Sequence, residues 1–116
     1  MPTATEVQET TAVPPTTERR AFVRFHCFGP CSVRRVGSED GEDLGMTYNL
    51  SRSGIGFALL GQLPVGTCVL LERVGRDNAR PLYGTVVRAV QMANAWFHGC
   101  QLNNLLTEEE LAAWLK

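Results

Sequence analysis

The sequence predicts a mainly β fold, a small six-stranded antiparallel barrel followed by one short C-terminal α-helix. Short runs rich in β-branched and aromatic residues alternate with turn residues about every 8–12 positions, which is typical of small barrels and sandwiches. The chain has 116 residues, 44% of them hydrophobic, which suits one domain with a real core. A barrel is favoured over a sandwich because it leaves no exposed strand edge.

The chain divides into a tail and a domain. Residues 1–17 are dominated by Thr, Pro and Glu without a sustained apolar period, so we expect a disordered N-terminal tail. The composition changes at Glu18, and residues 18–116 are expected to form the domain.

The strands follow from alternating apolar runs between turn signals. The first is expected over 22–28, is interrupted by Gly29-Pro30, and resumes over 31–36. The remaining five are expected over 46–50, 54–60, 67–74, 82–91 and 96–102. The connections between them are the polar loop 37–45, the turn 51–53, and the segments 61–66, 75–79 and 92–95.

The C-terminal segment carries the signals of a helix start. Thr107 and Glu110 have the spacing of a capping box, and Leu106 and Leu111 that of a hydrophobic staple. So short a helix is not stable alone, so it must pack on the barrel, with Trp114 as its expected anchor.

The charge balance excludes some functions. Net charge is −1, which does not suit a protein that coats nucleic acid, so any anion site must come from local clustering of Arg. Catalysis is poorly supported, because His26 and His98 lie in separate strand-like runs and no nucleophile-elbow pattern surrounds Ser51.

The four cysteines do not have the spacing of a metal site. Cys27 and Cys31 flank a turn, while Cys68 and Cys100 lie singly in separate runs. We expect no metal and buried or half-buried free thiols. Because the sequence has neither a signal peptide nor a membrane-length apolar stretch, a cytoplasmic location without membrane association is expected.

The first polar cluster is Arg19-Arg20-Ala21-Phe22-Val23-Arg24, at the junction of tail and domain. Arg20 and Arg24 stand four apart, so their guanidinium groups can converge on one site. Each offers paired N–H donors that match phosphate oxygens or the O6 and N7 atoms of guanine. From the spacing alone, a solvated basic patch at a domain edge is the favoured interpretation.

The second cluster is Asn49-Leu50-Ser51-Arg52-Ser53-Gly54. In an extended segment Asn49 and Ser51 point the same way, and an amide with a hydroxyl can bind the polar edge of a base. The missing Cβ of Gly54 allows an unusual φ or close ligand approach. An ordinary turn between strands is the alternative.

Together the clusters resemble the two motifs of PilZ domains, receptors for the bacterial second messenger cyclic di-GMP. Arg20-x-x-x-Arg24 matches the R-x-x-x-R motif, and Asn49-x-Ser51-x-x-Gly54 matches the D/N-x-S-x-x-G motif. The strand 84–88, the late segment 96–99 and the C-terminal helix also resemble the family. The resemblance covers about residues 18–116.

The resemblance implies a role for each matched residue. Arg20 and Arg24 would grip guanine edges and phosphates. Asn49 and Ser51 would contact a guanine base, and Gly54 would permit its close approach. Arg19 resembles the extra Arg of members that hold a stacked ligand dimer.

The implied mechanism is a switch. Cyclic di-GMP would order residues 19–24 against the barrel and so change a surface for another protein or a second copy of the chain, a homodimer remaining open. No cofactor beyond this ligand and no nucleic acid polymer is expected. The alternative is a PilZ-like adaptor that binds only protein, although members of that kind usually lack the Arg pair.

Overall fold

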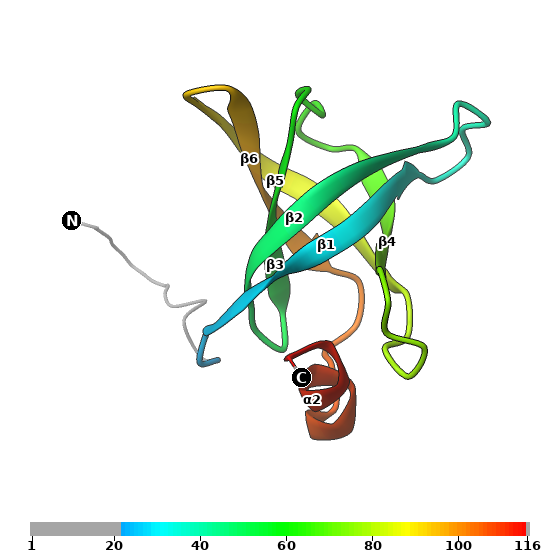
Figure 1. Ribbon diagram of the computed structural model, residues 1–116, viewed down its shortest axis with the longest axis vertical. Coiled ribbons are helices and arrows are strands. Elements are labelled where there is room, and N and C mark those ends of the chain that lie inside the picture. The colour runs from blue at the N-terminus through cyan, green and yellow to red at the C-terminus, as the bar shows by residue number, and fades with distance from the viewer. Residues whose placement is uncertain (1–21, 116) are drawn as a thin grey trace.

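A computed structural model describes residues 22–115 and contains six strands and one helix (Figure 1). Their bounds are β1 Phe25–Arg35, β2 Glu42–Leu50, β3 Gly54–Leu59, β4 Cys68–Arg73, β5 Leu82–Met92, β6 Ala95–Leu102 and α2 Glu108–Leu115. The predicted tail, 1–17, lies outside the described residues.

The strands form a closed antiparallel barrel in the order β1-β2-β3-β6-β5-β4, with β4 returning to pair with β1. The predicted six-stranded barrel with a C-terminal helix is therefore confirmed. The strands β2 and β3 pair directly as consecutive neighbours, and the turn between them carries the second polar cluster.

The first strand differs from the prediction because it continues through Gly29-Pro30. The register of β1 against β2 shifts between His26 and Gly29, where a β-bulge absorbs the irregularity. Pro30 lacks a backbone N–H but is compatible with such an irregular strand. The predicted break is wrong, because Gly29 and Pro30 both pair with β2, opposite Thr47 and Met46.

The second strand begins earlier than predicted. Residues 42–45 were expected in a polar loop, but they belong to β2, with Glu42 opposite Arg34 and Gly45 opposite Cys31. Arg34 and Glu42 also form an ion pair of 3.6 Å. Cross-strand pairing thus overrides the low intrinsic β-propensity of the acidic segment.

The core fills the barrel and continues beneath α2. Its largest fully buried side chains include Trp114, Phe57, Leu50 and Ile55. Among the aromatic residues, Phe57 is buried, whereas Phe25 and Phe28 are exposed.

The helix α2 begins as predicted. The Thr107 hydroxyl accepts the N–H of Glu110 at 3.1 Å, and the Glu110 carboxylate accepts the N–H of Thr107 at 2.8 Å. Trp114 is fully buried, and its indole N–H donates to the carbonyl of Arg80 at 2.8 Å. The capping box and the anchor are confirmed.

All four cysteines are free thiols. Cys27, Cys31 and Cys100 are buried, whereas Cys68 is exposed, contrary to the expectation of buried or half-buried thiols. Burial raises the pKa of Cys31 to about 11 and that of Cys100 to about 12, so both stay protonated at neutral pH.

None of the helices in the described range has the length and apolar character needed to span a bilayer.

Candidate functional site

The structure brings the two polar clusters together at one end of the barrel. Arg24 lies just before β1, and its Nη1 donates to the Oδ1 atom of Asn49 at 3.0 Å. Asn49 stands in β2 opposite His26 of β1. Strand pairing therefore places an arginine and an amide that are 25 residues apart in hydrogen-bonding contact.

Two glycines lie next to this pair. A Cβ on Gly54 would stand 3.4 Å from Nη2 of Arg24 and 3.0 Å from the carbonyl oxygen of Cys100. A Cβ on Gly56 would stand 2.7 Å from Oδ1 of Asn49. Neither glycine has a positive φ, so the glycines provide close approach rather than unusual backbone geometry.

The Ser51 side chain is engaged inside the turn. It is buried, and its hydroxyl accepts the backbone N–H of Ser53 at 3.2 Å and that of Gly54 at 3.1 Å. A backbone bond from the N–H of Ser51 to the carbonyl of Gly54, 2.8 Å long, closes the same turn. In this conformation Ser51 shapes the turn that presents its neighbours.

Two of the predicted site residues, Arg19 and Arg20, lie outside the described residues. The structure therefore locates Arg24, Asn49, Ser51 and Gly54 from the predicted set.

Arg52 makes contacts at this turn that the sequence did not indicate. Its Nε donates to the carbonyl of Leu106 at 2.7 Å, and its guanidinium carbon lies 5.4 Å from the centre of the Phe22 ring. The motif treats this position as variable, so its partners become visible only once the C-terminal segment is folded beside the turn.

Tyr48 is a second residue without a sequence signal. Its ring carbons would lie 2.8 and 2.9 Å from a Cβ on Gly56, so the ring lies across β3 at that glycine. The ring then reaches Phe97 of β6, with 5.1 Å between ring centres. Tyr48 and Phe97 are half-buried, so the outer barrel surface beside Asn49 is partly aromatic.

Two guanidinium groups lie at the candidate site. Arg24 is exposed and Arg52 half-buried. The Arg34–Glu42 ion pair lies at the opposite end of β1. Cationic forks beside an amide and small residues can bind phosphate and a base edge together.

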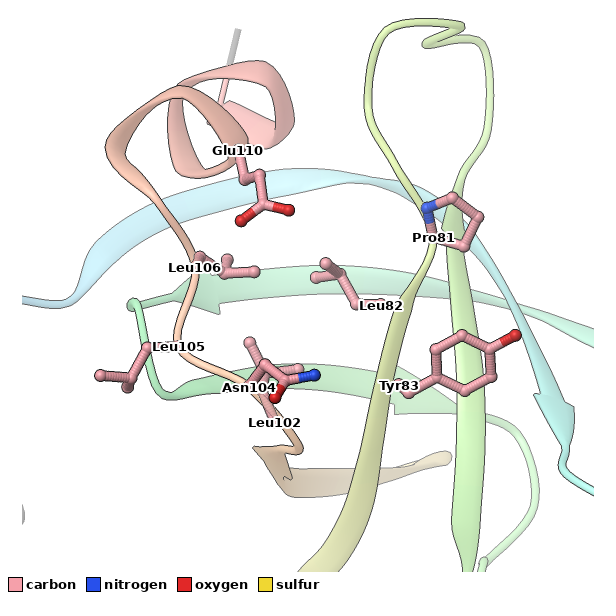
Figure 2. Close-up of a pocket in the computed structure, with 8 residues that line it drawn as sticks. All are labelled: Pro81, Leu82, Tyr83, Leu102, Asn104, Leu105, Leu106 and Glu110. Carbon is pink, nitrogen blue, oxygen red and sulfur yellow. The ribbon is translucent and has the colours of Figure 1, made fainter.

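A small recess lies on another part of the surface (Figure 2). Its volume is about 100 Å³, and it lies between the start of β5, the linker after β6 and α2. In the figure, Glu110 points from α2 toward Leu82 and Leu106. The volume of the recess is below the roughly 300 Å³ of a small-molecule pocket, so the recess does not suit a dinucleotide.

The described residues include no group of three potential metal ligands. His98 is fully buried, stacks on Phe57 with 5.1 Å between ring centres, and accepts the N–H of Leu63 at Nε2. Burial lowers the pKa of His98, which keeps the ring neutral. These contacts give His98 a structural role in the core.

Comparisons with known proteins identify the family and the fold. The family model described as PilZ domain matches residues 18–116. The comparison with curated protein sequences gives no match to the chain. Among solved structures, the chain is similar to the one titled "Structure of Bacillus subtilis Inhibitor of motility (MotI/DgrA)", with a TM-score of 0.63 and 17% identity.

That similarity covers 84% of this chain and 49% of the Bacillus subtilis protein, so this chain corresponds to about half of that protein's length. At this identity the likeness concerns the fold. The family consists of binding and adaptor domains rather than enzymes.

Proposed function

The chain belongs to the PilZ domain family, and on that premise we propose that it is a receptor for cyclic di-GMP. The proposed ligand surface comprises Arg24, Asn49 and Gly54, together with Arg19 and Arg20. The observation that carries the proposal is the contact of Arg24 with Asn49 directly beside Gly54, because it joins the two motifs into one surface.

The ligand's chemistry matches this surface. Cyclic di-GMP has two phosphates and two guanine bases, each base with acceptors at O6 and N7. A guanidinium group can bind either a phosphate or that guanine edge bidentately, and an amide can both donate and accept. The missing side chains at Gly54 and Gly56 leave room for the Arg24 guanidinium group and the Asn49 amide to lie against the barrel.

The proposed signal is the ordering of the lead-in, residues 19–24, on the barrel. Ligand phosphates would hold the arginines against the β2–β3 turn, and the reshaped surface would bind a protein partner. Binding free energy for the ordered state would come from charge-assisted hydrogen bonds. The proposed setting is the bacterial cytoplasm.

Titration calorimetry with cyclic di-GMP tests the proposal. Arg20→Ala and Arg24→Ala should each weaken binding at least about 100-fold, because each removes a charged hydrogen-bonding fork, worth roughly 1.5–3 kcal/mol per bond. The matched control is Arg35→Ala, since Arg35 is exposed at the far end of β1. Circular dichroism should show that all variants retain the barrel.

Absence of heat from the wild-type protein, confirmed by a second method such as equilibrium dialysis, contradicts the receptor proposal. Equal losses for Arg35→Ala and Arg24→Ala would instead indicate nonspecific electrostatic binding. The stoichiometry of the titration also shows whether one ligand or a stacked pair is bound, the question that Arg19 raises.

The second candidate is an adaptor that binds protein without nucleotide. Arg24 donates to Asn49 at 3.0 Å, so part of the hydrogen-bonding capacity of both side chains is used within the domain. The fold is also shared with a protein titled an inhibitor of motility. A protein partner whose affinity is unchanged by saturating cyclic di-GMP would favour this candidate.

A further inference from the structure

Arg52 joins three segments that are distant in sequence. Its Nε donates to the carbonyl of Leu106 at 2.7 Å, and the N–H of Leu106 donates back to the carbonyl of Arg52 at 2.9 Å. Its guanidinium group also lies over the ring of Phe22, two residues before Arg24. The adjacent carbonyl of Ser53 accepts the N–H of Leu102 at 2.9 Å, which strengthens the same junction.

These contacts use two different properties of one guanidinium group. The hydrogen bond to Leu106 lies in the plane of the group, whereas the contact with Phe22 uses its cationic charge over a ring. A lysine ammonium can lie near an aromatic ring but has no Nε–H in a planar fork. The arrangement therefore requires arginine rather than positive charge alone.

We infer that Arg52 is a positioning residue that holds the lead-in carrying Arg24 against the turn carrying Asn49 and Gly54. The same side chain fixes this turn to the linker that precedes α2. The inference rests on the proposed function, because it assigns Arg52 a part in organising that ligand surface. Arg52 acts through Phe22 and Leu106.

The junction gives the ligand surface a connection to the helix. Leu106 lines the recess beside α2 together with Leu82, Leu102 and Glu110 (Figure 2). A ligand that shifts Arg24 relative to Asn49 would also move Phe22, and Arg52 would transmit that shift to Leu106. Since coupling between two sites is reciprocal, fixing Leu106 also favours the ligand-binding arrangement of the lead-in.

A first experiment tests the junction without ligand. Amide hydrogen exchange of Leu106 should be at least about tenfold faster in Arg52→Gln and in Arg52→Lys than in wild type, because its bond to the Arg52 carbonyl loosens. The amide of Phe97, within the β3–β6 ladder, should stay within twofold. Arg35→Gln is the matched control and should leave both amides unchanged.

A second experiment adds cyclic di-GMP. Arg52→Gln and Arg52→Lys should each bind cyclic di-GMP about tenfold more weakly than wild type. Phe22→Leu should also lower the affinity for cyclic di-GMP. Because Arg52 acts through Phe22, the fold-changes of Arg52→Gln and Phe22→Leu should not multiply in the double variant. Wild-type protein should show ligand-dependent protection across residues 105–110, and Arg52→Gln should lose it.

The outcomes separate the two proposals. An unchanged Leu106 exchange rate in Arg52→Gln overturns the positioning role, whatever the nucleotide does. Full rescue of exchange and affinity by Arg52→Lys also overturns it, because charge alone would then suffice. No binding by wild type contradicts the receptor function, and it then also overturns the part of Arg52 in ligand binding.

Discussion

Gly56 lies directly against two side chains of the candidate site, those of Asn49 and Tyr48. The position gives the Asn49 amide and the Tyr48 ring space that any side chain would occupy. Both neighbours come from β2, and both lie across β3 at this point. The shape of the proposed ligand surface therefore depends on a residue outside the two matched motifs.

Gly56→Ala should lower the free energy of unfolding by about 1–3 kcal/mol, the usual cost of forcing an extra methyl group into a packed site. Its Cβ would stand 2.7 Å from Asn49 Oδ1 and 2.8 Å from a Tyr48 ring carbon, so it should also disturb the Arg24–Asn49 bond and weaken cyclic di-GMP binding. Chemical denaturation and calorimetry measure the two effects.

Gly61→Ala is the matched control for this substitution. Nothing lies within 4 Å of a Cβ at Gly61, and its φ is not positive, so the stability and the nucleotide affinity should stay near wild type. A Gly56→Ala protein with wild-type stability and affinity would show that Tyr48 and Asn49 have room to move aside.

The sequence predicts some of these residues better than others. Arg24, Asn49 and Gly54 could be predicted because each belongs to a motif whose chemistry suits an anionic ligand. Arg52 could not, since its partners Phe22 and Leu106 meet it only through the folded junction. The engagement of the Ser51 hydroxyl within its own turn likewise depends on the local backbone conformation.

At the level of elements, α2 is the part that local sequence determines most directly. Thr107 and Glu110 satisfy each other's backbone N–H groups, so the start of the helix needs no distant partner. Its end is held differently, by burial of Trp114 and the bond from its indole to Arg80. Both features could be predicted from spacing and residue type, apart from the identity of the indole's acceptor.

Thr107→Ala should destabilise the domain by about 1 kcal/mol, the typical cost of losing an N-cap side chain. For a domain of this size that corresponds to a fall in Tm of about 4–8 °C. Thermal unfolding followed by circular dichroism measures it.

Substitutions of two glutamates in the same turn serve as controls for the loss of the cap. Glu110→Gln should retain most of the stability because an amide oxygen can still accept the Thr107 N–H, and Glu109→Gln should change it little. If Thr107→Ala has the same Tm as the wild type, docking of Trp114 alone is sufficient to stabilise the helix.

The strands show where sequence patterns reach their limit. The cores of all six could be predicted from alternating apolar residues, whereas β1 and β2 run further than the local sequence indicates. Pairing between the two strands extends β2 into an acidic segment and continues β1 through Gly29-Pro30, just after a bulge. Both effects are cross-strand and therefore absent from any single window of sequence.

For the whole domain, the buried His98 links stability to pH. Its Nε2 accepts the N–H of Leu63 at 2.9 Å, which requires the neutral ring. Burial lowers the pKa of His98 below the ordinary 6.5. The unfolded state therefore binds a proton first as the pH falls, so protonation favours unfolding.

The stabilisation from neutral His98 should be complete above about pH 6.5 and should be lost as the pH falls from 6.5 toward the lower pKa of the folded state. Over that window His98 contributes a slope of at most about 1.4 kcal/mol per pH unit. Urea denaturation between pH 5 and pH 8 measures it.

His98→Gln should flatten this dependence, because the amide oxygen can accept the Leu63 N–H and does not titrate. His26→Gln is the control: His26 is exposed, so its replacement should leave the slope unchanged. A His98→Gln protein with the wild-type slope below pH 6.5 would assign the dependence to other groups.

The junction at Arg52 has a consequence for protein engineering. Phe22 before the barrel and Leu106 after it both contact one turn, and the start of β1 and the helix α2 lie at the same end of the molecule (Figure 1). A reporter fused ahead of the lead-in and another fused after α2 would therefore be held close to each other and to the candidate site. The domain is for that reason well suited to a resonance-energy-transfer sensor, in which small ligand-driven shifts at one turn change the separation of two fused fluorophores.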